Sequence, residues 1–227
     1  MRTLLLDSAS PVIGVAAYVG DEPVWQDSVR QLQGADAWLG PALEAGIQAL
    51  GGLDRVAVVV GPGTFTGLRV GVASALGLAM AHTIEVVPLS SLALRAWLSP
   101  ESPEVLVVLD ARKDRVYAGL FGWDAGGPVL RRAEWDCAPE ELCALPPAVV
   151  VGEGALRYRA LLEKGGHRVV EQPDRSAVGQ VGPWLRAQTA RPLHEISLHY
   201  LRAPDAKIPA EMRQNGSERV DPVAEGR

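Results

Sequence analysis

The sequence predicts an α/β protein of two consecutive domains that share one order of strands and helices. Three observations support this. A short apolar strand ends in an aspartate twice, at Asp7 and at Asp110. A valine-rich strand followed by a glycine turn also occurs twice, and six of seven residues agree between 57–63 and 148–154. Each copy follows three expected strands and one expected helix, and this shared order strengthens the case for a repeat.

The first domain is expected over residues 1–101. Residues 3–6, 12–19 and 24–29 read as strands joined by short turns, which predicts an antiparallel meander. A helix is expected over 35–50, where Leu39 and Leu43 recur at helical spacing and a glycine pair ends the pattern. A strand at 55–60 then meets the turn Gly61-Pro62-Gly63 and a long helix. A strand at 85–88 and a helix at 90–98 complete the half.

The second domain is expected over residues 102–202. Strands at 104–109, 115–121 and 129–135, a short helix at 139–144 and a strand ending at Gly152 repeat the first plan. Each domain should therefore contain a mixed sheet flanked by helices. Two such repeats describe the ribonuclease-H-like architecture of actin and the sugar kinases, whose acid-tipped strands and glycine turns line a nucleotide cleft. Residues 203–227 are rich in proline, glycine and charge, which predicts a flexible tail.

Composition narrows the functional classes. The 227 residues carry a net charge of −5, so no basic face for independent RNA binding is expected. Two cysteines are too few for a disulfide framework, and the four histidines lack the spacing of metal ligands. No metal site of the chain's own is expected. No apolar run approaches the ~20 residues of a membrane span, and the N-terminus lacks a signal-peptide core, so we expect a cytoplasmic protein.

The stretch from 58 to 71 resembles a phosphate loop, because a strand reaches a helix N-terminus through glycines. It fails both standard motifs, since Leu68 stands where a P-loop needs lysine and Thr66 stands where a dinucleotide loop needs glycine. The acids can instead simply end their strands, and Arg69 can be a solvated first-turn residue. The candidate nucleotide-facing or phosphate-facing residues are Asp7, Gly61, Gly63, Thr64, Arg69, Asp110, Gly152 and Gly154.

The helix after this loop carries small residues at four-residue spacing. Gly67, Gly71, Ala75 and Ala79 therefore share one face. Such a face lets another backbone approach closely. It can pack on the domain's own sheet, or it can receive a partner helix, and the sequence leaves both interpretations open.

Three motifs resemble those of one bacterial family. Gly61-Pro62-Gly63-Thr64-Phe65-Thr66-Gly67-Leu68-Arg69-Val70-Gly71 is similar to the signature loop of the TsaB (YeaZ) family. Asp110 to Tyr117 resembles its second-domain hairpin, and Tyr200-Leu201-Arg202 resembles its C-terminal motif. The resemblance covers about residues 1–202. The chain departs from the family at 35–37, where a His-Ser-Glu-like element is replaced by Ala-Asp-Ala.

The resemblance implies a non-catalytic subunit for threonylcarbamoyladenosine modification of tRNA next to the anticodon. It implies a TsaD-like catalytic paralogue and a TsaE-like ATPase as partners, which would bind the ATP and divalent metal, with tRNA engaged through the complex. Pairing, or a homodimer, would use the first-domain helices, so the expected interface residues are Leu39, Leu43, Gly67, Gly71, Ala75 and Ala79. An actin-like ATPase or small-molecule kinase is the alternative. A peptidase is less favoured, because no nucleophile–base pair can be built.

Overall fold

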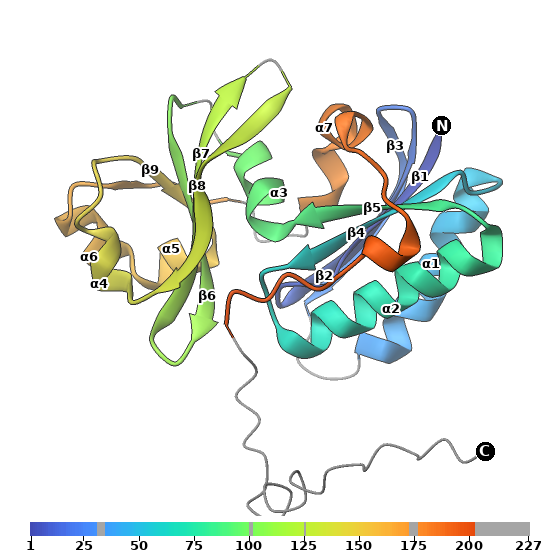
Figure 1. The fold of residues 1–227 in the computed structure, drawn as a ribbon, viewed down its shortest axis with the longest axis horizontal. Helices are drawn as coiled ribbons and strands as arrows, with labels where there is room; N and C mark the ends of the chain where they lie inside the picture. The colour runs from blue at the N-terminus through green and yellow to red at the C-terminus, as the bar shows by residue number, and fades with distance from the viewer. Residues whose placement is uncertain (31–34, 100–101, 125, 173–176, 203–227) are drawn as a thin grey trace, which may run out of the picture.

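The computed structural model describes residues 1–30, 35–99, 102–124, 126–172 and 177–202, which form two lobes side by side (Figure 1). The first lobe is built on a five-stranded sheet in the order β3-β2-β1-β4-β5. β1 pairs antiparallel with β2 and parallel with β4, which in turn pairs parallel with β5. Its strands are β1 (Arg2–Asp7), β2 (Val12–Val19), β3 (Glu22–Arg30), β4 (Arg55–Gly61) and β5 (Glu85–Ser90).

The second lobe repeats this topology. Its sheet has the order β10-β9-β6-β7-β8, so β6 holds the central place that β1 holds in the first sheet. β6 is antiparallel to β7 and parallel to β9. The predicted duplicated α/β fold with two mixed sheets is confirmed. The strands are β6 (Val105–Arg112), β7 (Arg115–Asp124), β8 (Gly127–Cys137), β9 (Val149–Val151) and β10 (Arg168–Val169).

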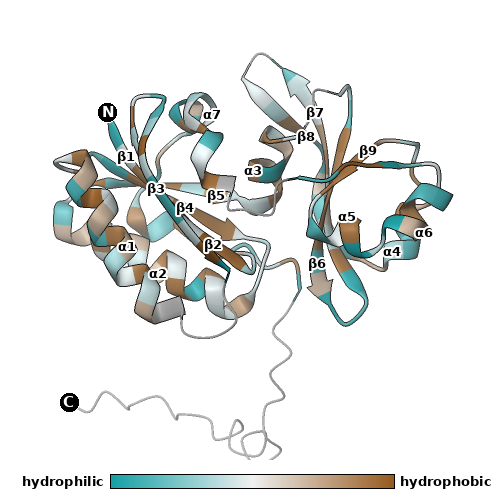
Figure 2. Cartoon of the chain, turned by 180° about the vertical axis from the view of Figure 1, so that it is seen from behind, coloured by the Kyte–Doolittle hydropathy of each residue, from teal (hydrophilic) through white to brown (hydrophobic). Residues whose placement is uncertain are grey.

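Two long helices cover one face of the first sheet. α1 (Ala35–Leu50) and α2 (Phe65–His82) share a core with β1, β2 and β4, in which Leu4, Val15 and Val58 are fully buried. The second lobe has only short helices in these places: α4 (Pro139–Leu142), α5 (Glu153–Arg157) and α6 (Arg159–Lys164). Figure 2 shows hydrophobic residues along the central strands, as burial of both sheet faces requires. No helix in the described ranges is long and apolar enough to cross a membrane.

Helix α3 (Ser91–Trp97) lies between the two lobes (Figure 1). Leu92 and Ala96 pack with Leu109 and Phe121 of the second sheet, whereas Leu94 belongs to the core of the first. Trp97 at its end stacks near Trp184 and Trp123, with ring centroids 6.4 and 5.9 Å away. A seven-residue helix therefore gives the lobes a shared apolar core.

The chain returns to the first lobe after β10. Val178, Val181, Trp184 and Leu185 pack on the face of the first sheet opposite α1. Val178 belongs to the 3-10 turn η1 (Ala177–Gln180), Trp184 and Leu185 belong to α7 (Gly182–Ala187), and Val181 is the N-cap residue between them. The expected second domain over 102–202 stays a prediction, although the buried apolar side chains within 177–187 pack on the first sheet. The boundary at 101/102 stays a prediction, and the expected tail lies outside the described residues.

Candidate functional site

The glycine turn after β4 packs against the protein itself. Gly61 has φ 132°, and a Cβ there would collide with the carbonyl oxygen of His199. A Cβ on Gly63 would collide with the carbonyl oxygen of Ala9, and the Thr64 amide donates to that same oxygen at 2.8 Å. Internal packing thus explains these three loop residues, and their phosphate-facing role stays a prediction.

The second glycine turn repeats this arrangement. Gly152 has φ 105°, and a Cβ there would collide with the carbonyl oxygen of Val108 on β6. A Cβ on Gly154 would lie 2.8 Å from the carbonyl carbon of Leu109. Both glycines are therefore required where α5 begins beside β6, and this accounts for the sequence echo without a ligand.

The two strand-ending aspartates also share a local bond. Asp7 Oδ1 accepts from the amide of Ala9 at 2.9 Å, and Asp110 Oδ1 accepts from the amide of Arg112 at 2.9 Å. The Asp7 carboxylate thus holds the turn after β1, whereas the Asp110 carboxylate holds the last residues of β6, which ends at Arg112. Their second oxygens differ, since Asp110 Oδ2 accepts from Arg157 at 2.8 Å whereas Asp7 Oδ2 is buried without a hydrogen-bond partner.

Arg95 of α3 supplies a cation between the two lobes. Its Nη2 lies 3.5 Å from Asp7 Oδ2, and its Nε lies 3.8 Å from Glu153 Oε2 at the start of α5. Nη1 donates to the carbonyl oxygen of Ser91 at 3.0 Å. Asp7 is fully buried and the Arg95 side chain is only 10% exposed. Within the described residues, the guanidinium of Arg95 therefore lies between the carboxylates of Asp7 and Glu153. A nucleotide bound at this place would bring a metal cation, and the guanidinium already takes that position. Sequence reasoning missed Arg95, because nothing in its local pattern marks it.

Glu153 carries an unusual charge environment. Burial of its carboxyl raises the pKa above its ordinary value, and the nearby carboxylates of Asp7 and Asp110 act in the same direction. Arg95 opposes the shift but does not cancel it. Perturbed carboxyls of this kind occur at functional sites and in structural ion-pair clusters. Within the described ranges no group of three or more His, Cys, Asp or Glu side chains could hold a metal ion.

Arg69 lies against aromatic rings rather than near an acid. Its guanidinium carbon is 3.6 Å from the centroid of Phe65, and its Nε donates to Tyr200 Oη at 3.3 Å. Phe65 and Tyr200 stack with centroids 5.0 Å apart. Arg69 and Tyr200, which are 131 residues apart in the sequence, therefore meet at the first turn of α2, a contact that no local pattern could predict.

A second polar cluster also joins the lobes. His199 Nε2 lies 2.9 Å from Glu134 Oε2 on β8, and the hydroxyl of Ser90 donates to Glu134 Oε1. The carboxylate stands between the hydroxyl and the imidazole, so this is not a serine activated by a histidine base. The geometry gives no support to a peptidase.

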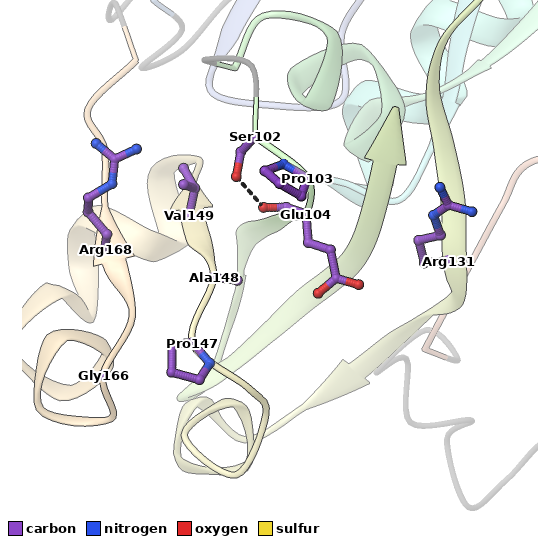
Figure 3. A pocket seen from close by; sticks show the side chains of 9 residues that line it. All are labelled: Ser102, Pro103, Glu104, Arg131, Pro147, Ala148, Val149, Gly166 and Arg168. Atoms are coloured by element: carbon purple, nitrogen blue, oxygen red, sulfur yellow. Dashed lines mark hydrogen bonds between the residues drawn. The ribbon is translucent and has the colours of Figure 1, made fainter. Parts of the chain in front are cut away.

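A cavity of about 660 Å³ opens elsewhere on the second lobe (Figure 3). Arg131 and Arg168 stand on opposite sides of it, with Glu104 between them. It lies where β6, β9 and β10 begin, at the other end of these strands from Asp110 and Gly152. The cavity is thus separate from the carboxylate cluster between the lobes.

Comparisons with known proteins agree with the signature loop. The family model for TsaD, tRNA N6-adenosine threonylcarbamoyltransferase, matches residues 39–126. An uncharacterized protein of Mycobacterium tuberculosis is 36% identical over 157 residues, which cover 68% of this chain and 67% of that protein. The tRNA threonylcarbamoyladenosine biosynthesis protein TsaB of Escherichia coli is 37% identical over 70 residues, about 30% of each chain.

A solved structure extends the likeness to the whole fold. YeaZ from Pseudomonas aeruginosa matches with a TM-score of 0.66 and 26% identity, over 81% of this chain and 88% of that one. The chain belongs to the TsaB (YeaZ) family. In this TsaB-family chain, the glycine loop packs on the turn after β1 and on the C-terminal segment.

The expected partner face of α2 is wrong. Gly71, Ala75 and Ala79 are buried, and a Cβ on Gly67 or Gly71 would collide with Ser8. Leu39 and Leu43 of α1 are likewise buried in the first core. The small residues exist because α2 packs closely on its own sheet and on the turn after β1.

The outer face of α2 was missed, although helical periodicity could have shown it. Ala73 and Gly77 are exposed there, and Met80 is 71% exposed. No charged residue interrupts the helix between Arg69 and His82. An outward face this apolar is unusual for a helix in water.

Proposed function

We propose that the chain is a non-catalytic subunit required for threonylcarbamoyladenosine modification of tRNA next to the anticodon. In this proposal it binds and supports a TsaD-like catalytic paralogue and works together with a TsaE-like ATPase. Family membership supports the pathway, since the E. coli relative is a threonylcarbamoyladenosine biosynthesis protein. The complex acts in the cytoplasm, where ATP and a divalent metal are bound by the partner subunits.

One observation carries the non-catalytic part of the proposal. The place between the acid-tipped strands is filled by the chain's own groups, with Arg95 between Asp7 and Glu153. The adjacent glycine turns are packed against His199 and Val108. A nucleotide would have to displace these contacts before any phosphate chemistry. The alternative ATPase or kinase function gains nothing from this geometry.

The outer face of α2 is the surface that we assign to the catalytic paralogue. Ala73 and Gly77 let a second helix approach closely, and Met80 offers an adaptable apolar contact. A partner of the same fold presents a comparable helix, which makes a helix-against-helix contact the natural geometry. The same face would serve a homodimer when the paralogue is absent. The net charge of −5 fits tRNA held mainly by the partners.

A reconstituted reaction tests the proposal. Purified catalytic paralogue and ATPase from the same organism are combined with unmodified tRNA, ATP and the threonylcarbamoyl donor system, with and without this chain. We expect no modified nucleoside from the chain alone and a strong increase when it joins the other two. A rate that does not change when this chain is left out would refute the proposal.

A further inference from the structure

The last described segment forms a strap across the first lobe. We use "strap" for residues 191–200. The amide of Arg191 donates to the carbonyl oxygen of Val86 at 2.8 Å, and the amide of His199 donates to that of Val60 at 2.8 Å. Leu193, Ile196 and Leu198 pack against the core beneath α1 and α2. The strap is thus fixed by backbone bonds near both ends and by apolar contacts between them.

The strap ends on the signature loop. The carbonyl of His199 occupies the space beside Gly61 that a side chain would fill. Tyr200 then stacks on Phe65 and accepts from Arg69. The two family motifs, in the loop at 61–71 and at Tyr200, therefore contact each other. This gives the loop a binding partner within the chain.

A single ionic contact ties the strap to the second lobe. His199 Nε2 meets Glu134 Oε2 at 2.9 Å, and the Glu134 side chain is only 8% exposed. Glu134 also accepts a hydrogen bond from the neutral hydroxyl of Ser90. A carboxylate this buried needs a cation close by. Protonated His199 is the cation that the geometry supplies.

We propose that the strap is a protonation-dependent latch, in which imidazolium His199 pins residues 199–200 to Glu134 and loss of its proton frees them from the loop. Release uncovers Phe65 and Arg69 at the first turn of α2, beside the outer face of that helix. The strap thus links the second lobe to this surface. The proposal holds for the isolated chain, whether or not the proposed function is correct.

The direction of the pH effect follows from the contact. The hydrogen bond to Glu134 raises the pKa of His199 above its ordinary value of 6.5, and Glu134 is the charged group that acts on it. Beside this contact, β4 contributes the carbonyl of Val60, which accepts from the His199 amide, and β5 contributes the neutral hydroxyl of Ser90, which donates to Glu134. The pairing is complete below the ordinary value and is lost as the pH rises through the raised pKa. The latch therefore holds below the ordinary pKa of a histidine and opens as the pH rises through the raised pKa of His199.

Amide hydrogen exchange on the full chain tests the latch, at about pH 6 and about pH 9, with protection factors corrected for the intrinsic rate. We expect the protection of the His199 amide to fall several-fold between the two conditions. The Arg191 amide should keep its protection and serves as the internal control. His199→Gln removes the titrating group from this position, so its protection at 199 should not depend on pH.

Nuclear magnetic resonance of the imidazole provides the second measurement. His199 should titrate above its ordinary value in the native chain and return toward it in Glu134→Gln. Equal protection of the His199 amide at both pH values would overturn the proposal. His199→Gln would also overturn the proposal if its amide protection at position 199 fell between the two pH values as much as in the native chain, because another group would then control the strap.

Discussion

Gly71 and Gly77 lie on the same helix but in opposite environments. A Cβ at Gly71 would collide with the side chain of Ser8, whereas one at Gly77 would meet nothing within 4 Å. We expect Gly71→Ala to lower the free energy of unfolding by about 1–3 kcal/mol through overpacking. Gly77→Ala should raise it by about 0.5–1 kcal/mol through better helix propensity. Urea unfolding of both variants measures the difference.

This pair also corrects an expectation drawn from the sequence. If the small-residue face of α2 were free to bind a partner helix, Gly71→Leu would disrupt pairing and leave the monomer folded. The structure predicts instead that it destabilises the first lobe, because Gly71 is buried against the turn after β1. If Gly71→Ala were as stable as Gly77→Ala, the close contact of α2 with Ser8 would be wrong.

Glu153 gives a pH prediction at the same scale. Its folded pKa is raised, chiefly by burial, so ionisation of this carboxyl costs stability in the folded state. The native chain therefore loses stability as the pH rises from the ordinary value near 4.5 through the raised pKa. Glu153→Gln should gain in Tm relative to the native chain over this interval. The control is Glu163→Gln on α6, an exposed glutamate with no resolved shift, and a constant Tm difference for Glu153→Gln would contradict the assignment.

At the scale of elements, the outer face of α2 is open to a direct test. Gly77→Arg adds a long charged side chain where a partner helix would approach, in a position that has free space in the monomer. We expect it to prevent co-elution with the catalytic paralogue in size-exclusion chromatography while its circular dichroism and Tm stay native. Glu140→Arg, at an exposed position of α4 in the second lobe, is the control for an arginine added on another surface. Normal pairing by Gly77→Arg would rule out this face.

The strands and their duplication could be predicted because they depend on local patterns. Central strands of both sheets are buried on two faces, so they read as continuous apolar runs such as 57–60 and 105–109. The glycine turns could also be predicted from a local pattern, because Gly61 and Gly152 have backbone conformations that favour glycine. Four-residue spacing correctly placed Gly71 and Ala75 on one face. It could not say which face is buried, although Leu68 and Val72 beside them favour the inner one.

The parts of the candidate site that escaped prediction depend on distant contacts. Arg95 belongs to the site because it lies near Asp7 and Glu153, which are in different lobes. The strap contains one proline and one short 3-10 turn (Leu193–Glu195) and has no strong period, so its return to the first sheet leaves little trace in the sequence. The contact between Tyr200 and Phe65 depends on that return. Such placements follow from packing of the whole chain.

At the scale of the whole molecule, Arg95 is the charged link between lobes. Arg95→Met keeps much of the apolar stem but leaves buried Asp7 without a cation, so we expect a loss of about 3–5 kcal/mol in unfolding free energy. Asp7→Asn in the same chain should recover part of that loss. Arg157→Met, whose partners Asp110 and Asp114 lie within the second lobe, should cost less because those groups reach solvent. Equal losses for the two arginine variants in urea unfolding would contradict this role.

The molecule as a whole has two lobes whose shared space is already occupied. α3 fills it with apolar side chains, Arg95 lies between the carboxylates of Asp7 and Glu153, and the strap packs on the glycine turn. A kinase or ATPase of this architecture needs that space for its nucleotide. A subunit that assembles an enzyme can do without it, and it needs an unpartnered surface instead.

Isothermal titration calorimetry tests this account most directly. The isolated chain is titrated with Mg-ATP in one experiment and with the TsaD-like catalytic paralogue in a second. The account predicts saturable heat with the paralogue and none with Mg-ATP. Saturable binding of Mg-ATP together with no heat from the paralogue would contradict it.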